Sequence, residues 1–128
     1  MKVGMIGWEF PPFMAGGLGI HCLELTTQLA KLGVDIDFYM PHMALEGNLR
    51  VAEHHKHLRI HEIEADPDLT PYNASRGYDE AFNDAVWHYN QRVVSEFRTE
   101  GVDIIHSHDW ITFQAAIELK RRTGKPLV

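Results

Sequence analysis

The sequence predicts an α/β protein built on an open, mainly parallel sheet flanked by helices. Three observations predict this class: an apolar run at residues 2–6, a helical apolar pattern after a glycine-containing loop, and a second apolar run at residues 34–40. A strand, a helix and a strand in this order form a right-handed βαβ unit, in which the two strands are parallel. A later helix pattern followed by a short apolar run extends the same alternation.

The first half of the chain contains three of the expected elements. Residues 2–6 form a short buried strand that Gly7 closes. The helix that follows the loop ends at Gly33, because glycine readily takes the left-handed conformation that ends helices. Residues 34–40 form the second strand, which Pro41 stops. The apolar side chains that define one face of the helix are Leu18, Cys22, Leu25, Leu29 and Leu32.

The second half has a less regular start. Residues 42–75 are polar and irregular, apart from a short strand expected at residues 58–63. A long amphipathic helix is expected at residues 78–100, followed by a buried strand at residues 102–105 and a helix that runs to about Arg122. The apolar positions of the long helix are Phe82, Val86, Tyr89, Val93 and Phe97.

The last residues indicate a truncated domain. Residues 126–128 are apolar and follow a turn at residues 123–125, which is typical of the start of another strand. If this strand lies inside a larger sheet, its unpaired backbone edge favours self-association of the fragment. We therefore expect one domain over residues 1–128 that lacks its remaining strands or a second domain.

Length and charge limit the possible functions. At 128 residues the chain forms about one domain of the usual size. Hydrophobic residues make up 45% and charged residues 23%, the balance of a chain that folds around a core. The net charge of -6 gives no positive field, which disfavours binding to nucleic acids or to anionic membranes.

The cysteine content and the apolar runs predict a cytoplasmic protein. Cys22 is the only cysteine, so no internal disulfide can form, which suits a reducing compartment. The apolar run at the start is too short for a signal peptide. No stretch approaches the ~18 apolar residues that a membrane span needs, so we expect no membrane span.

The glycine-containing loop is the first candidate binding site. In open α/β sheets the ligand crevice lies outside the carboxyl ends of the strands. Gly16, Gly17 and Gly19 lie where the loop turns into a helix, and they leave backbone amides and the positive helix end open to a phosphate or a sugar hydroxyl. A tight turn that only lets the helix pack close to the sheet explains these glycines equally well.

The glycines do not match the dinucleotide-binding fingerprint. That motif places its glycines directly after the strand, whereas a long loop intervenes here. It also needs an acidic residue at the tip of the second strand, where this chain has Tyr39, Met40 and Pro41. A nucleotide-binding α/β oxidoreductase is therefore the weaker hypothesis, and a non-catalytic sugar-binding α/β module is a third.

The second candidate segment contains two histidines. His108 follows a buried strand, where an imidazole can hydrogen-bond a substrate hydroxyl or a developing charge, although a packed histidine at a loop is the more common case. Asp109 is well placed to cap the next helix. His106 shares a face with His108 only while the backbone stays extended, and Trp110 is expected in the core.

A group of histidines near the middle of the chain matches a metal site only in part. His57 and His61 would share one face of a helix, as zinc ligands do. The alternation of Leu58 and Ile60 with polar residues instead indicates a surface strand, and no cysteine or clear third ligand lies beside it. We expect no metal here. The other histidines of the group are His54 and His55.

Taken together, the candidate segments resemble the amino-terminal half of the retaining glycosyltransferases of the GT-B fold. The nearest likeness is to bacterial and archaeal glycogen synthase-like enzymes, and it covers the chain in element order. The motifs that carry it are Glu9-Phe10-Pro11-Pro12, Gly16-Gly17-Leu18-Gly19 with His21, and His106-Ser107-His108-Asp109-Trp110.

The resemblance implies one half of a two-domain enzyme. Such enzymes have two Rossmann-like domains that face a cleft, and residues 1–128 correspond to the amino-terminal, acceptor-side domain. The carboxyl-terminal domain, which holds most of the nucleotide sugar, is absent from this chain. The implied reaction moves a sugar, with glucose expected, from a nucleotide-sugar donor to an acceptor hydroxyl with retention. No metal or other cofactor is implied, because helix dipoles and basic side chains stabilise the departing diphosphate.

The resemblance also implies roles for individual residues. Gly16 and Gly17, with Gly19, would approach the donor diphosphate or its sugar when the cleft closes. His108 would contact the transferred sugar near the reacting carbon. This assignment requires the glycine pair and the imidazole to open onto a common hollow. Further candidate contacts with the substrate are Glu9, His21 and Asp109.

One departure from the family pattern bears on the donor. Bacterial glycogen synthases that use ADP-glucose usually carry a lysine just ahead of the glycine pair, where this chain has Met14 and Ala15. A lysine would give the phosphates a mobile point charge. Its absence disfavours ADP-glucose and favours the broader group of related transferases.

Overall fold

The computed structural model describes residues 1–42, 55–69 and 77–128. Within these residues, four strands form one sheet with the order β3-β2-β1-β4, and every neighbouring pair is parallel. This sheet confirms the predicted fold class. The strands are β1 (Lys2–Ile6), β2 (Asp35–Pro41), β3 (Leu58–Ile63) and β4 (Ile104–Ser107).

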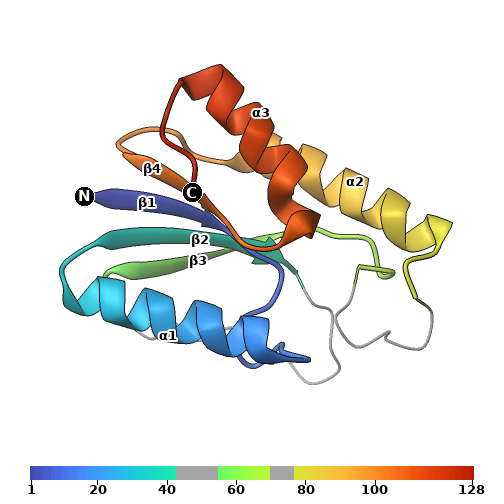
Figure 1. Cartoon of the computed structure of the whole chain (residues 1–128), viewed down its shortest axis with the longest axis horizontal. Coiled ribbons are helices and arrows are strands. Elements are labelled where there is room, and N and C mark those ends of the chain that lie inside the picture. Colours follow the sequence, from blue (N-terminus) through green and yellow to red (C-terminus); the bar gives the residue numbers. More distant parts are fainter. Residues whose placement is uncertain (43–54, 70–76) are drawn as a thin grey trace.

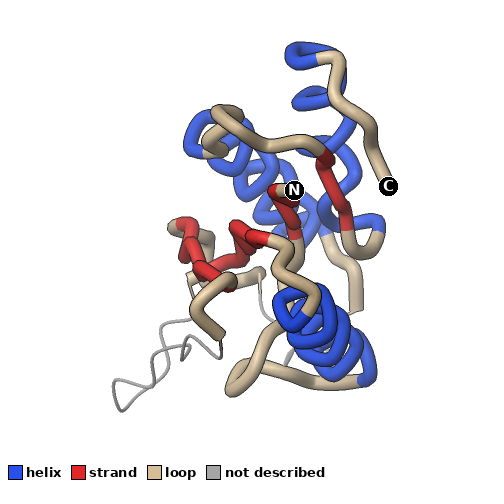
Figure 2. Tube along the Cα trace, turned by 90° about the vertical axis from the view of Figure 1, so that its left-hand side faces the viewer, coloured by secondary structure: helices blue, strands red, loops and turns tan. Residues whose placement is uncertain are grey.

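The helices cover both faces of the sheet. The first helix lies on one face and the last two lie on the other (Figure 1), and Figure 2 shows the same layers from the side. A short 3-10 helix connects β4 to the last helix. The helices are α1 (Gly17–Lys31), α2 (Glu80–Glu96), η1 (Trp110–Thr112) and α3 (Phe113–Thr123). None of the helices in the described ranges has the length and apolar character needed to cross a bilayer.

The alternation of side chains along the strands divides the core between the two layers. Phe38 of β2 packs in the cluster formed with α1, whereas its neighbour Tyr39 packs in the cluster formed with α2 and α3. Both side chains are fully buried. Burial of a side chain such as Phe38 contributes about 1.5–3 kcal/mol to folding. The sheet is therefore covered by apolar packing on both faces, as parallel sheets require.

α2 is shorter than the helix predicted at residues 78–100. It begins after Asp79, whose carboxylate accepts a hydrogen bond from the amide of Phe82 at 2.9 Å. It ends before Phe97, which takes an extended conformation. The ring of Phe97 lies over Gly4, where a Cβ atom would be 2.2 Å from the ring. The ring of Phe97 can pack here only because residue 4 has no side chain.

β4 spans residues 104–107 rather than the predicted 102–105. Val102 is apolar and buried, but the pairing of β4 with β1 starts at Ile104, which lies beside Val3. Strand pairing therefore sets this boundary, not apolar character. As a result, His106 is a strand residue that pairs with Met5. In the same way, Pro41 is the last residue of β2 and not the residue that follows it.

Residues 126–128 lie beside β4 in parallel orientation. The amide of Ile105 donates a hydrogen bond to the carbonyl of Pro126 at 2.9 Å, and the amide of Val128 donates to the carbonyl of Ile105 at 3.0 Å. Leu127 forms a parallel β-bridge with Ile105. The predicted start of a further strand is confirmed.

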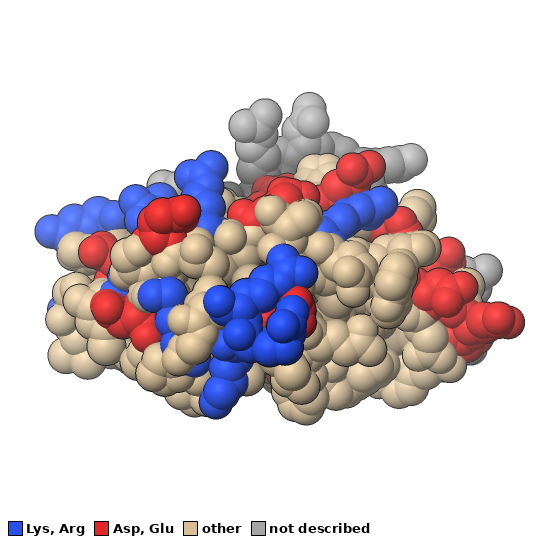
Figure 3. Space-filling view, turned by 90° about the horizontal axis from the view of Figure 1, so that it is seen from above, with Lys and Arg blue, Asp and Glu red and all other residues tan. Residues whose placement is uncertain are grey.

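Charged side chains of both signs are interspersed on the face of the molecule shown in Figure 3. In α3, Arg121 and Arg122 contact the carboxylate of Glu118 at 2.8 and 2.6 Å. The two guanidinium groups lower the pKa of Glu118 to about 2. These arginines are therefore paired within their own helix.

Candidate active site

The loop after β1 and the end of β4 meet at the carboxyl-terminal edge of the sheet. The amide of His108 donates a hydrogen bond to the carbonyl of Ile6, the last residue of β1, at 2.9 Å. The chain then passes from β1 through the loop into α1, where the ring of His21 lies 5.6 Å from that of His108, centroid to centroid. The helix start that carries the glycines and His108 thus lie on the same side of the sheet.

The side chain of His108 is buried. It is 5% exposed, and its Nε2 atom has no hydrogen-bond partner among the described residues. Its ring stacks on that of His106 at a centroid distance of 4.2 Å, and the ring of His21 meets it edge to face. The expectation that this imidazole opens onto a hollow is wrong for this chain. The extended backbone places the rings of His106 and His108 on the α1 side of the sheet, where His21 packs against His108.

Burial determines the charge of these histidines. Burial, helped by the neighbouring His106 and His21, lowers the pKa of His108 to about 4. Burial and the nearby His21 also lower the pKa of His106. At neutral pH the imidazole of His108 is therefore uncharged, so one ring nitrogen can donate a hydrogen bond and the other can accept one.

The three glycines have different environments. Gly16 and Gly17 are exposed, and a Cβ atom built on either would meet nothing within 4 Å. Gly19 is buried, and a Cβ atom there would lie 2.5 Å from the side chain of Met14. The packing within the described chain thus requires a glycine at position 19 but not at positions 16 and 17. The first turn of α1 has no side-chain cap and no acidic residue, which leaves its amides open to a ligand.

Glu9 supports the loop that precedes α1. It is 5% exposed, and its Oε2 atom accepts a hydrogen bond from the amide of Ala15 at 3.2 Å. Burial, together with the nearby carboxylate of Glu9, raises the pKa of the Cys22 thiol to about 12. The structure therefore places Glu9 beneath the loop, whereas His21 is exposed on α1.

Asp109 and Trp110 form the turn after β4. Asp109 has a φ of 70°, which residues other than glycine rarely adopt. Its carboxylate accepts a hydrogen bond from the amide of Trp110 at 2.7 Å, which confirms it as the cap of the following helix, η1. The predicted core position of Trp110 is wrong. Its side chain is 40% exposed and packs edge to face on Tyr78 at 5.4 Å, because the chain turns at Asp109 before the buried face of α3 begins.

Asn90 is a site-forming residue that the sequence analysis did not identify. It is buried in α2, and its Nδ2 donates to the carbonyl of Ile111 at 2.6 Å. Its Oδ1 accepts a hydrogen bond from the amide of Ala115 at 2.7 Å. One side chain thus joins α2 to η1 and to the first turn of α3. The signal in the sequence is an asparagine inside the apolar stripe of the helix, between Val86 and Val93.

Two histidines, one just before β3 and one within it, contact carboxylates of β2. His57 lies 2.8 Å from Asp35, and His61 lies 3.0 Å from Asp37. Burial alone would raise the pKa of Asp37, but hydrogen bonds from Lys2, Arg59 and His61 hold it well below its usual range. Within the ranges that the structure describes, no three His, Cys, Asp or Glu side chains form a group suited to a metal ion. His54 lies outside these ranges.

Sequence comparison connects the chain with glycosyltransferases. The model of a family described as the starch synthase catalytic domain matches residues 2–127. An uncharacterized glycosyltransferase of Methanocaldococcus jannaschii is 26% identical, over 100% of this chain and 30% of its own length. A glycogen synthase of Mycobacterium tuberculosis is 28% identical, over 100% of this chain and 32% of its own length. The chain thus spans about a third of the length of these curated relatives.

A solved structure has the same fold. Sucrose-phosphate synthase from Thermosynechococcus elongatus superposes with a TM-score of 0.72 at 19% sequence identity. The match covers 98% of this chain and 31% of that chain. It confirms the predicted Rossmann-like α/β architecture.

Proposed function

Because the chain belongs to the starch synthase catalytic domain family, we propose that it is the amino-terminal, acceptor-side domain of a retaining glycosyltransferase of the glycogen synthase type. The observation that carries this proposal is the family match across nearly the whole chain. The enzyme that combines this domain with a carboxyl-terminal, donor-binding domain is called the whole enzyme below. Its compartment in this proposal is the cytoplasm, which suits a chain with one buried thiol.

The proposed reaction transfers a sugar, with glucose expected, from a nucleotide sugar to an acceptor hydroxyl. The bond between the anomeric carbon and the diphosphate oxygen breaks, and its electron pair leaves with the nucleoside diphosphate. A bond forms from the anomeric carbon to the acceptor oxygen, which releases its proton. Charge therefore develops on the diphosphate and on the sugar, and groups fixed near these positions accelerate the reaction.

The start of α1 is the proposed contact for the donor. The exposed Gly16 and Gly17 let a phosphate or a sugar approach the backbone closely, and the uncapped amides and the positive end of the helix favour a negative charge. Gly19 contributes indirectly in this proposal, because it makes room for Met14 under the loop. Glu9 holds the same loop through its bond to Ala15.

His108 is the proposed contact for the transferred sugar. An uncharged imidazole can exchange hydrogen bonds with a sugar hydroxyl, and the buried Nε2 atom of His108 has no other partner among the described residues. Contact with a sugar requires the exposed ring of His21 to turn away from His108. His21 and Asp109, both exposed at this edge, are proposed to touch the substrate after that movement.

An assay with different labelled nucleotide sugars tests the proposed function. The whole enzyme should release a nucleoside diphosphate and a glycosylated acceptor in equal amounts, and the new linkage should retain the anomeric configuration. The 128-residue chain alone should show no turnover, because most donor contacts belong to the other domain. Tight binding of NAD without any response to nucleotide sugars would instead support the oxidoreductase hypothesis.

Alanine substitutions at the glycine pair should separate function from folding. We expect Gly17→Ala to leave the unfolding free energy of the chain unchanged or to raise it by about 0.4–1 kcal/mol, since the new methyl group meets no other atom and the unfolded chain loses freedom. Gly16→Ala should lower this free energy by no more than about 1 kcal/mol, because Gly16 is the N-cap of α1 and glycine is preferred to alanine there. The same changes should lower kcat/KM for the nucleotide sugar in the whole enzyme. Urea unfolding and steady-state kinetics measure the two effects.

Gly19→Ala is the matched control for these substitutions. Its methyl group would lie 2.5 Å from the side chain of Met14, so the chain should lose stability. If Gly16→Ala and Gly17→Ala leave the kinetics of the whole enzyme at the wild-type level, the glycine pair is not the donor contact.

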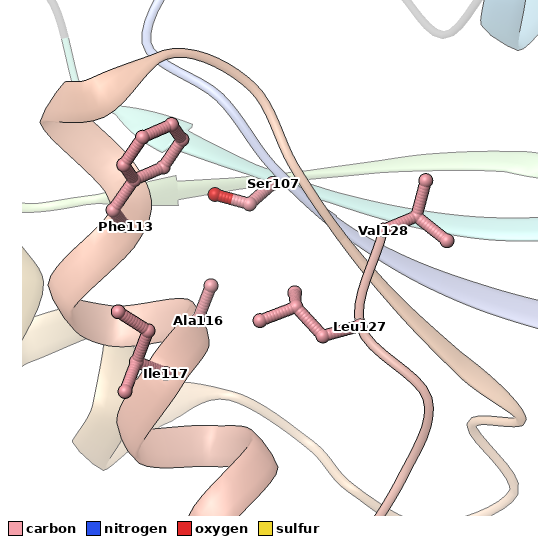
Figure 4. Close-up of a pocket in the computed structure, with 6 residues that line it drawn as sticks. All are labelled: Ser107, Phe113, Ala116, Ile117, Leu127 and Val128. Atoms are coloured by element: carbon pink, nitrogen blue, oxygen red, sulfur yellow. The ribbon is translucent and has the colours of Figure 1, made fainter.

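We also propose that the chain on its own self-associates beside residues 126–128. This segment pairs with β4 at the outer edge of the sheet, and a pocket of about 420 Å³ lies between the segment and α3 (Figure 4).

Sedimentation of the 128-residue chain should show a dimer at high concentration. Ile117→Glu, at the exposed wall of the pocket, should favour the monomer, whereas Leu32→Glu, at the exposed residue just after α1, should not. A monomer at all concentrations contradicts this proposal. The pocket is lined by Ser107, Phe113, Ala116, Ile117, Leu127 and Val128.

A further inference from the structure

His106 is a histidine of β4 to which neither the family resemblance nor the proposed mechanism gives a role. It pairs in the sheet with Met5, and its side chain is half-buried. Its ring lies nearly parallel to that of His108, at an interplanar angle of 27° and a centroid distance of 4.2 Å. This spacing is a direct stack of two imidazoles, and it exists because the extended strand projects residues 106 and 108 to the same face.

We propose that His106 is a positioning residue for His108, and that the stack of the two rings holds the imidazole of His108 in one orientation at the sugar site. The proposal rests on the proposed function for the meaning of that site. His106 does not touch the substrate in this proposal, so it is not a catalytic residue.

The surroundings of His108 leave the stack as the main support of the ring. From β2, the ring of Phe38 approaches at 6.3 Å, and from α1 the edge of His21 approaches at 5.6 Å. Among the described residues, no side chain hydrogen-bonds to the Nε2 atom. The flat contact with His106, at 4.2 Å, is the shortest of the three ring contacts. The orientation of His108 is therefore held by packing rather than by a hydrogen bond at Nε2.

The stack also affects the charge of His108. The titratable groups that face it are His106 from β4 and His21 from α1, and Phe38 from β2 is uncharged. A proton on His108 would repel a proton on either neighbour, and burial disfavours the charged ring further. The loop carboxylate of Glu9 is hydrogen-bonded to the amide of Ala15. An uncharged His108 favours a sugar hydroxyl as its hydrogen-bond partner. A protonated, positively charged imidazole would attract the diphosphate instead.

Titration of the histidine rings by NMR tests the inference on the 128-residue chain. In the wild type, His108 should titrate near a pKa of about 4. In His106→Ala the stack is lost and water reaches the ring, so this pKa should rise by at least one unit towards the ordinary value of about 6.5. In His106→Phe a flat ring remains but the titratable nitrogens are gone. The pKa of His108 should then stay well below about 6.5, and the ring contacts with His21 should persist.

Kinetics of the whole enzyme provide the second measurement. His106→Ala should lower kcat several-fold with little change in the KM for the nucleotide sugar, and the acidic limb of its pH profile should move upward with the pKa of His108. His106→Phe should restore most of kcat. The control is His88→Ala, a histidine of α2 whose ring contacts Asp66 and Trp87. It should change neither the pKa of His108 nor the pH profile.

The titrations decide the inference independently of the proposed function. It is overturned if His108 of the wild type titrates at the ordinary value, or if a folded His106→Ala leaves its pKa and ring contacts unchanged. If His106→Ala does not fold, the wild type and His106→Phe decide, and a His108 pKa near the ordinary value in His106→Phe overturns the role of the flat stack. If the whole enzyme transfers no sugar, the proposed function fails, while the titrations still support or overturn the positioning of His108 by His106.

Discussion

Replacement of His108 by alanine should lower kcat of the whole enzyme about 10²–10³-fold, the loss typical of removing one hydrogen-bond donor that stabilises developing charge. Alanine removes the ring whose unpartnered Nε2 atom is the proposed contact for the transferred sugar. The KM for the nucleotide sugar should change little, because the other domain holds most of the donor in this proposal. Steady-state kinetics with labelled donor measure both constants.

The fold should survive this substitution. The imidazole is buried, so its loss removes packing, but it also removes a buried polar atom that has no partner. The net change in the free energy of unfolding should stay within about 0.5–3 kcal/mol, the usual range for single substitutions. Urea unfolding of the 128-residue chain measures this change. A folded His108→Ala enzyme with wild-type turnover would remove the catalytic assignment and leave His108 with a structural role only.

Elements defined by local patterns could be predicted from the sequence. β1 and β3 have the bounds 2–6 and 58–63 that the apolar runs indicate. The apolar stripe indicates α1, in which Cys22 is fully buried and Leu18, Leu25 and Leu29 are half-buried. The fifth predicted member of the stripe, Leu32, lies just beyond the helix and is exposed. These patterns succeed because the burial of a strand or a helix face requires apolar residues at fixed spacing.

Features that depend on distant partners could not be predicted in this way. The start of β4 is set by its pairing with β1, a segment about 100 residues earlier in the chain. The packing of Phe97, just after α2, over Gly4 joins two segments that are far apart in the sequence. The convergence of the glycines and His108 followed from a general property of parallel sheets, but the burial of His108 depends on how His21 of α1 packs over it.

Asn90→Ala should destabilise the chain by about 2–4 kcal/mol, because it leaves buried backbone groups without partners. In the wild type, the Asn90 side chain bonds the carbonyl of Ile111 at 2.6 Å and the amide of Ala115 at 2.7 Å. The amide of Ala115 lies in the first turn of α3 and has no partner within that helix. Urea unfolding monitored by circular dichroism measures the loss.

Asn83→Ala is the matched control on the same helix. Asn83 is exposed and donates only one long hydrogen bond, to the carbonyl of Tyr78 at 3.4 Å, so its replacement should change stability by less than about 0.5 kcal/mol. Equal effects of the two substitutions would show that the loss at position 90 reflects helix propensity and not the link to η1 and α3.

Asn90→Asp tests the direction of each hydrogen bond. The carboxylate can still accept from the amide of Ala115, but its second oxygen faces the carbonyls of Val86 and Ile111, which accepted from the amide group of asparagine. Protonation restores a donor at this position, so the pKa of the new carboxyl group should be raised in the folded state.

A raised carboxyl pKa means that the folded state of Asn90→Asp binds more protons than its unfolded state. The stability of Asn90→Asp relative to Asn90→Ala should therefore increase as the pH falls from about 7 to about 5. A relative stability that does not depend on pH would show that the carboxylate turns away from these carbonyls.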